Sequence, residues 1–213
     1  AFRTQQNRWV AGSMHTAVSW LGPILRSDRP LREKVDLAFY LTGNLNYLLL
    51  LLLVFAVPPA VLLRLGGDTR WLWADVPFFL FATGSVVAFY GRTRPPGSSR
   101  ARFYLTRIPG LMALGLGMTV HNSRAVFRGV LGRARVFERT PKEGAAGPKR
   151  RRRRLSGAVT TGLAEFVMAA YVLSAVAISV RGGSLISVPL LGLFAAGYLL
   201  VVWAAIGPRS TTR

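Results

Sequence analysis

The stretch Leu48-Leu49-Leu50-Leu51-Leu52-Leu53-Val54-Phe55-Ala56-Val57 decides the fold class of this chain, because none of its side chains carries a polar atom. It lies within an apolar segment, residues 37–63, that is long enough to cross a bilayer as a helix. In hydrocarbon the backbone polar groups must bond within the segment, so it must be helical. The sequence therefore predicts an all-α membrane protein.

Further apolar segments make the predicted number of transmembrane helices about four. Pro58-Pro59 is expected to kink or end the first of them. Trp71 and Trp73 lie where an aromatic belt is expected, just before the second. The predicted helices after the first are 74–90, 157–180 and 184–206, and the predicted regions are 1–36, 37–90, 91–154 and 155–213.

Residues 108–120 are apolar but number only 13, whereas a straight spanning helix needs roughly 20. Arginines flank them on both sides. We interpret 103–135 as an interfacial or re-entrant helical stretch, and a third, glycine-rich spanning helix is the alternative.

The charge pattern predicts the orientation in the membrane. Net charge is +20, from 28 Lys+Arg against 8 Asp+Glu. These charges fall between apolar segments, so anionic lipid headgroups explain them better than nucleic acid does. Between 92 and 154 there are 17 basic residues and two acids, which predicts a cytoplasmic region and both termini in the cytoplasm.

With no cysteine in its 213 residues, the chain has neither a disulfide nor a thiolate metal site.

An amphipathic interfacial helix is predicted over 2–21, with Gly22-Pro23 breaking it and a charged connector over 26–36. One face carries an indole, an amide and a guanidinium, a combination that suits a sugar with a charged substituent. An interfacial helix anchored by Trp and Arg is the alternative. This face comprises Gln5, Arg8, Trp9 and Gly12, and the opposite, apolar face comprises Val10, Met14, Ala17, Val18 and Leu21.

The spacing Gln5-x-x-Arg8-Trp9 resembles a motif of the processive family 2 glycosyltransferases, the group that includes cellulose synthase. A second motif, Phe137-x-x-Thr140-x-Lys142, is similar to the cytosolic gating loop of that family. The run Arg139-Thr140-Pro141-Lys142 is more like its mannan synthase branch. The two motifs follow each other in the family's order, with two predicted membrane segments between them.

The resemblance implies that Gln5, Arg8 and Trp9 bind the acceptor sugar and that Phe137, Thr140 and Lys142 close over the nucleotide diphosphate. The parent would use a nucleotide sugar to extend a β-linked polysaccharide and help export it, in a bacterial inner or plasma membrane. The chain starts at Ala1 and has no Asp-x-Asp pair. We therefore expect a C-terminal portion without catalytic residues, inactive alone. The aspartates and their divalent metal, Mg²⁺ or Mn²⁺, would lie in a missing N-terminal domain.

Two interpretations stay open at this point. Glu165, an acid about eight residues inside the predicted spanning helix 157–180, lines a polysaccharide channel or has a structural partner, and in both cases faces the bundle. The chain itself is a glycosyltransferase portion or a non-enzymatic polytopic membrane protein, such as a transporter subunit or scaffold. Residues 144–154 are predicted to be a flexible basic linker.

Overall fold

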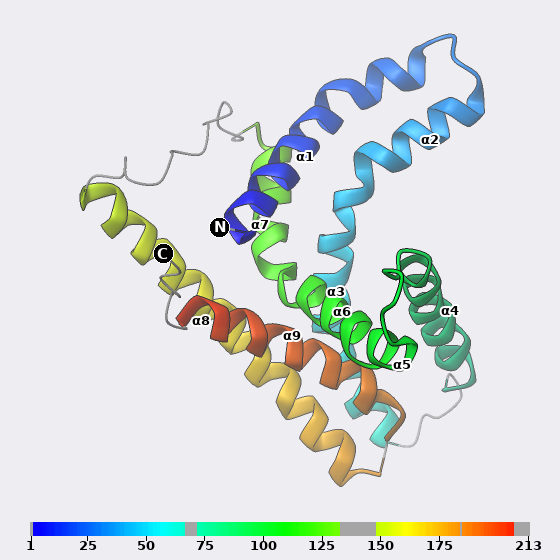
Figure 1. Cartoon of the computed structure of the whole chain (residues 1–213), viewed down its shortest axis with the longest axis vertical. Coiled ribbons are helices and arrows are strands. Elements are labelled where there is room, and N and C mark those ends of the chain that lie inside the picture. The colour runs from blue at the N-terminus through cyan, green and yellow to red at the C-terminus, as the bar shows by residue number, and fades with distance from the viewer. Residues whose placement is uncertain (1, 67–71, 133–147, 184, 207–213) are drawn as a thin grey trace. The chain divides into compact units, whose positions relative to one another are not determined.

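The computed structural model describes residues 2–66, 72–132, 148–183 and 185–206, and every regular element within these ranges is helical (Figure 1). The all-α part of the prediction is thus confirmed. The helices divide between two compact units. Unit 1 comprises Ala1–Leu53 and Met118–Ala164, and unit 2 comprises Val54–Gly117 and Glu165–Arg213.

Unit 1 is built around the pairing of its first and last complete helices, α1 and α7, with α2 packed against α1. Its core is small and apolar, formed by Val10, Ala11, Met14, Ala17, Leu41, Ala125 and Val126. Its elements are α1 (Phe2–Arg26), α2 (Leu31–Thr42), η1 (Gly43–Leu45), the start of α3 (Asn46–Leu65), α7 (Thr119–Val130) and the start of α8 (Pro148–Arg181).

The predicted break of the first helix at Gly22-Pro23 is wrong, because α1 continues to Arg26. A proline inside a helix removes one backbone hydrogen bond. Here Ile24 packs against the core of unit 1, which favours keeping the last turn. The helix ends where the backbone N–H and the hydroxyl of Ser27 both donate to the Ile24 carbonyl oxygen, at 3.2 and 2.7 Å.

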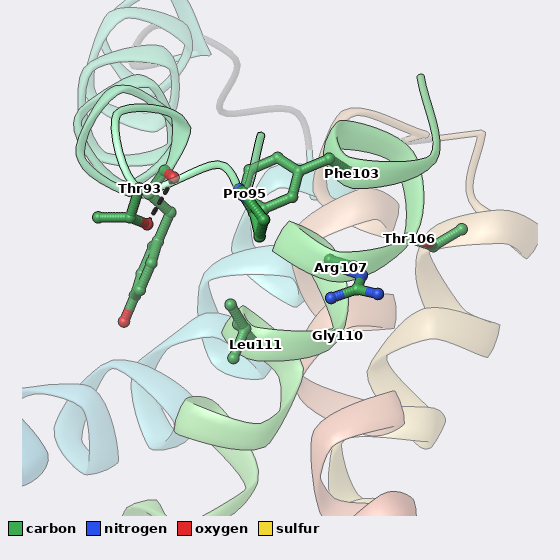
Figure 2. A pocket seen from close by; sticks show the side chains of 8 residues that line it. Thr93, Pro95, Phe103, Thr106, Arg107, Gly110 and Leu111 are labelled. Atoms are coloured by element: carbon green, nitrogen blue, oxygen red, sulfur yellow. Dashed lines mark hydrogen bonds between the residues drawn. The ribbon is translucent and has the colours of Figure 1, made fainter. Parts of the chain in front are cut away.

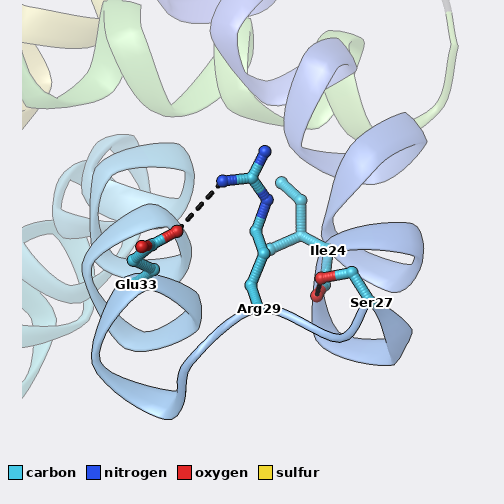
Figure 3. Close-up of polar contacts among 4 residues, drawn as sticks. All are labelled: Ile24, Ser27, Arg29 and Glu33. Carbon is cyan, nitrogen blue, oxygen red and sulfur yellow. Dashed lines mark hydrogen bonds and ion pairs between the residues drawn. The ribbon is translucent and has the colours of Figure 1, made fainter.

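The predicted connector over 26–36 is also shorter than expected, because α2 begins at Leu31. Pro30 precedes the first turn, where its missing N–H costs nothing, and Glu33 in that turn complements the helix dipole. Arg29 pairs with Glu33 at 3.0 Å across the turn (Figure 3). Since both side chains are more than half exposed, the pair is worth about 1 kcal/mol or less.

Unit 2 contains the rest of α3 and α8 together with the remaining helices. They are α4 (Leu72–Gly91), α5 (Arg100–Arg102), the π-helical turn η2 (Phe103–Arg107), α6 (Ile108–Gly117), η3 (Leu185–Ser187) and α9 (Val188–Ile206). The Tyr171 hydroxyl on α8 donates to the Phe55 carbonyl oxygen on α3 at 3.0 Å, and the two rings lie 6.0 Å apart.

In unit 2, α6 and α9 come into direct backbone contact at two glycines, Gly117 and Gly197 (Figure 1). A Cβ built on Gly197 would meet the Gly117 nitrogen at 2.8 Å and would overlap the Ala113 carbonyl oxygen. Small residues therefore let the two backbones touch, as is common between helices in membranes.

Three described helical segments are long and apolar enough to cross a membrane: Leu31–Leu65, Gly162–Arg181 and Leu185–Ala205. The first runs through Pro58 and Pro59, so the prolines do not end it. Val54, Pro58 and Val61 are buried on one face of α3, which favours the uninterrupted helix. For the predicted span 74–90, the described residues contain an apolar helix over Leu80–Gly91, which is shorter than the three spanning segments.

The stretch predicted as interfacial or re-entrant, 103–135, is not one continuous helix. The helices Arg100–Gly117 and Thr119–Val130 are separated by a break at Met118, as in a broken span or a re-entrant loop. Farther along, the helical backbone of α8 begins at Pro148, inside the predicted basic linker. A proline is tolerated in a first helical turn, and arginines are good helix formers.

Candidate functional site

The candidate site is the face of α1 that points away from the core of unit 1. Trp9 is 59% exposed and Gln5 is exposed, whereas Arg8 is half-buried. A Cβ built on Gly12 would meet no heavy atom within 4 Å. The residues of the predicted face therefore lie together on one side of α1, and there is open space beside Gly12.

The opposite face anchors α1, through buried Val10, Ala11, Met14 and Ala17. The sequence prediction was right for Val10, Met14 and Ala17 and wrong for Val18, which is 56% exposed. At 100° per residue, the buried stripe continues from Ala17 through half-buried Leu21 to Ile24. Val18 falls beside that stripe.

The backbones of α1 and α7 touch at Gly129. A Cβ built on Gly129 would lie 2.5 Å from the Ala11 carbonyl oxygen and 2.7 Å from the Met14 Cβ. Only glycine fits at this crossing without a shift of the backbone. The close approach fixes α1, and with it the face that carries Trp9.

Polar contacts fix α1 further, and they centre on Asn7, inside the motif itself. The Asn7 amide donates to the His121 carbonyl oxygen at 3.0 Å, and Arg128 donates to the Asn7 amide oxygen. The His121 Nε2–H donates to the Arg3 carbonyl oxygen at 3.2 Å. Sequence reasoning missed these residues. The signal for Asn7 was its spacing of three and seven from Val10 and Met14 on the buried face.

Burial, and secondarily the positive charge of Arg3, lower the pKa of His121 from 6.5 to about 4. This residue lies on amphipathic α7, outside the three apolar helices. Its imidazole is therefore neutral at pH 7, and protonation would place a cation beside Arg3 and Arg128.

We expect unit 1 to lose stability as the pH falls from 6.5 toward 4. In that window the unfolded chain binds a proton at His121 and the folded chain does not, so the free energy of unfolding decreases. Thermal unfolding in detergent at pH 7 and pH 5 measures this. The drop in the midpoint should be smaller in His121→Gln, and an equal drop in both proteins would contradict it.

The other candidate residues fall elsewhere. Phe137, Thr140 and Lys142 lie outside the described residues. Glu165 on α8 is fully buried, as its predicted position facing the bundle requires. No group of three or more potential metal ligands occurs among the residues that the structure describes.

No protein-family model matches the chain, and neither a curated protein nor a solved structure matches it. The chemistry of the site therefore rests on its own residues. An exposed indole, an amide and a guanidinium on one rigid helix face are suited to bind a polyhydroxylated ring that carries or adjoins an anionic group.

Proposed function

We propose that this chain is the membrane portion of a processive family 2 glycosyltransferase. In the parent enzyme it receives a β-linked polysaccharide built from a nucleotide sugar and helps export it. The observation that carries the proposal is the open face of α1, with Gln5, Arg8, Trp9 and Gly12 together. Gln5, Arg8 and Trp9 are the positions at which the sequence resembles that family.

In this proposal Trp9 stacks on the apolar face of the acceptor sugar, Gln5 bonds its hydroxyls, and Arg8 meets oxygens of the diphosphate. Gly12 leaves room for the ring to approach the helix backbone. The contacts of Asn7 and Gly129 hold α1 in place before the ligand arrives. Such preorganisation lowers the entropic cost of binding.

The remaining parts of the enzyme follow from the same proposal. Phe137, Thr140 and Lys142 form the cytosolic gating loop, and four crossings put both termini in the cytoplasm of a bacterial cell. Catalytic aspartates and a divalent metal belong to a domain outside this chain. Glu165, buried on α8, is available to the sugar path only if that path enters the bundle.

Glycan binding by the chain itself tests the acceptor face. The chain in detergent is titrated with cellohexaose and with mannohexaose, and binding is followed by saturation-transfer NMR. Trp9→Ala should weaken binding about tenfold, which corresponds to about 1.4 kcal/mol. The fold should survive, since Trp9 is not part of the core.

Trp20→Ala is the matched control, because Trp20 is also 59% exposed and lies 11 residues, roughly 16 Å, further along α1. It should bind glycan like the parent chain. Equal losses in the two variants would make Trp9 an ordinary interfacial anchor, and the chain a membrane protein of another class.

Lys142→Ala should weaken inhibition of the full-length enzyme by the free nucleoside diphosphate about tenfold, because a charge-assisted hydrogen bond to phosphate is lost. The Michaelis constant for acceptor should change less. Lys149→Ala removes a charge outside the motif and serves as the control. An unchanged inhibition constant in Lys142→Ala would contradict closure of this loop over the nucleotide.

A further inference from the structure

An open pocket, called the cavity below, lies in unit 2 between the end of α4 and the turn that leads into α6. It has a volume of about 490 Å³. Figure 2 shows Thr93 and Pro95 on one side of it and Phe103, Arg107 and Leu111 on the other. Tyr90, Thr106 and Gly110 complete the lining.

The α4 side of the cavity is held by short hydrogen bonds. The backbone N–H and the hydroxyl of Thr93 both donate to the Tyr90 carbonyl oxygen, at 3.0 and 2.8 Å. The Arg94 guanidinium donates to the Ser98 carbonyl oxygen at 2.6 Å and closes the following turn. Gly97 within that turn has φ +77°, a conformation that favours glycine.

The opposite side is a π-helical turn, η2, a feature that occurs frequently at functional sites. It continues directly into α6, so Phe103, Arg107 and Leu111 follow one another along the same side of the helix (Figure 2). The two sides touch at Gly91, where an added Cβ would lie 2.7 Å from the Tyr104 hydroxyl. The close contact at Gly91 therefore holds the two sides of this open pocket against each other.

The cavity has an apolar part and a charged part. Phe103 is buried and Leu111 is 45% exposed, so they give the cavity an apolar floor. The Arg107 side chain is exposed, and its guanidinium makes no hydrogen bond or ion pair with any residue that the structure describes. Its guanidinium is available at the edge of the apolar surface.

The charges in the sequence that forms the cavity are all positive. No Asp or Glu occurs between residues 76 and 137. Arg92, Arg94, Arg100 and Arg102 flank the cavity in sequence and add to the charge of Arg107. A positive field of this kind attracts phosphate groups.

The cavity also lies at a polarity boundary of the chain. Apolar Leu80–Gly91 ends at it on one side, and apolar α6 begins at it on the other, with the arginine segment between them. In a membrane such a junction falls at the depth of the lipid headgroups.

We propose that this cavity binds an anionic glycerophospholipid. The lipid phosphate accepts hydrogen bonds from Arg107, and the start of an acyl chain lies along Leu111 and Phe103. A free phosphate would use the charge and leave the apolar floor empty. This proposal does not depend on the glycan function of α1.

Native mass spectrometry of the whole chain in neutral detergent tests it, with palmitoyl-oleoyl-phosphatidylglycerol and the matching phosphatidylcholine as probes. Phosphatidylglycerol should be retained in preference to phosphatidylcholine. Arg107→Gln keeps a long polar side chain without the charge and should lower the affinity for phosphatidylglycerol about fivefold, the effect of one basic residue at a membrane surface. Arg107→Lys should restore most of the affinity.

Arg102→Ala is the matched control, an exposed arginine of the same segment that does not line the cavity, and it should change the affinity less than twofold. Equal effects at Arg102 and Arg107 would mean diffuse charge attraction and would overturn the proposal. Equal retention of the two lipids would do the same.

Leu111→Gln separates a lipid from a free anion, because it removes apolar surface and no charge. It should weaken retention of phosphatidylglycerol, and excess inorganic phosphate should not displace the lipid fully. Full displacement by phosphate with no effect of Leu111→Gln would assign the cavity to a free anion and contradict the proposal. Circular dichroism of each variant shows that it is folded.

Discussion

Gly197→Val is expected to destabilise unit 2 by about 3 kcal/mol or more. A Cβ at this position would collide with backbone atoms of Ala113 and Gly117 on α6, which have no freedom to rotate away. Overpacking of a tight core costs about 1–3 kcal/mol when side chains adjust, and a backbone collision costs more. We therefore expect α6 and α9 to separate or to shift against each other.

Denaturation in detergent, followed by circular dichroism and by limited proteolysis, measures this loss. Gly192→Val is the matched control, since Gly192 is on the same helix and a Cβ there would meet nothing within 4 Å. It should be close to neutral. If the two variants were equally stable, the glycine contact between α6 and α9 would not exist.

Under the proposed function, Trp9→Ala is expected to lower polymer formation by the full-length protein on the order of 100-fold. A misplaced reacting group costs about that factor, and the acceptor would lose the surface that orients it. Stability should be nearly unchanged, because Trp9 contributes nothing to the core around Val10 and Met14. The protein should therefore remain folded and membrane-bound.

Incorporation of labelled sugar into insoluble polymer by isolated membranes measures the effect, with the amount of protein normalised by immunoblot. Trp20→Ala should retain the parental rate. Polymer formation at the parental rate in Trp9→Ala would refute the acceptor role of the indole.

Hydropathy and helical period were sufficient for much of the fold. The uncharged run over 48–57 and the closing segments predicted helices that are present, because burial of backbone groups in hydrocarbon permits little else. The spacing of Val10, Met14 and Ala17 placed the buried face of α1, and it left Trp9 outside.

Helix ends and crossings were not predictable in the same way. Pro23 and Pro58 are local helix breakers, yet packing around Ile24, Val54 and Val61 favours continuous helices there. The role of Gly129 depends on which backbone crosses it, and that partner, the backbone at Ala11, lies far away in the sequence, near the N-terminus.

The polar contacts of Asn7 could not be predicted from local sequence patterns either. Asn7 belongs to the motif by position, but its partners His121 and Arg128 belong to a distant helix. No local pattern pairs them. The division of the motif into an exposed face and a partly buried anchoring residue, Asn7, became visible only when α1 and α7 were seen together.

Photocrosslinking from α1 tests most directly whether its open face contacts a glycan. A benzophenone amino acid is introduced at Gly12, beside Trp9, or at Val18, which is 56% exposed but lies off that face. Under the proposed function, membranes that contain the full-length protein then extend labelled polymer under illumination. We predict that label attaches to the protein from position 12 and not from position 18. Label from neither position, or from position 18 alone, would contradict a glycan on this face.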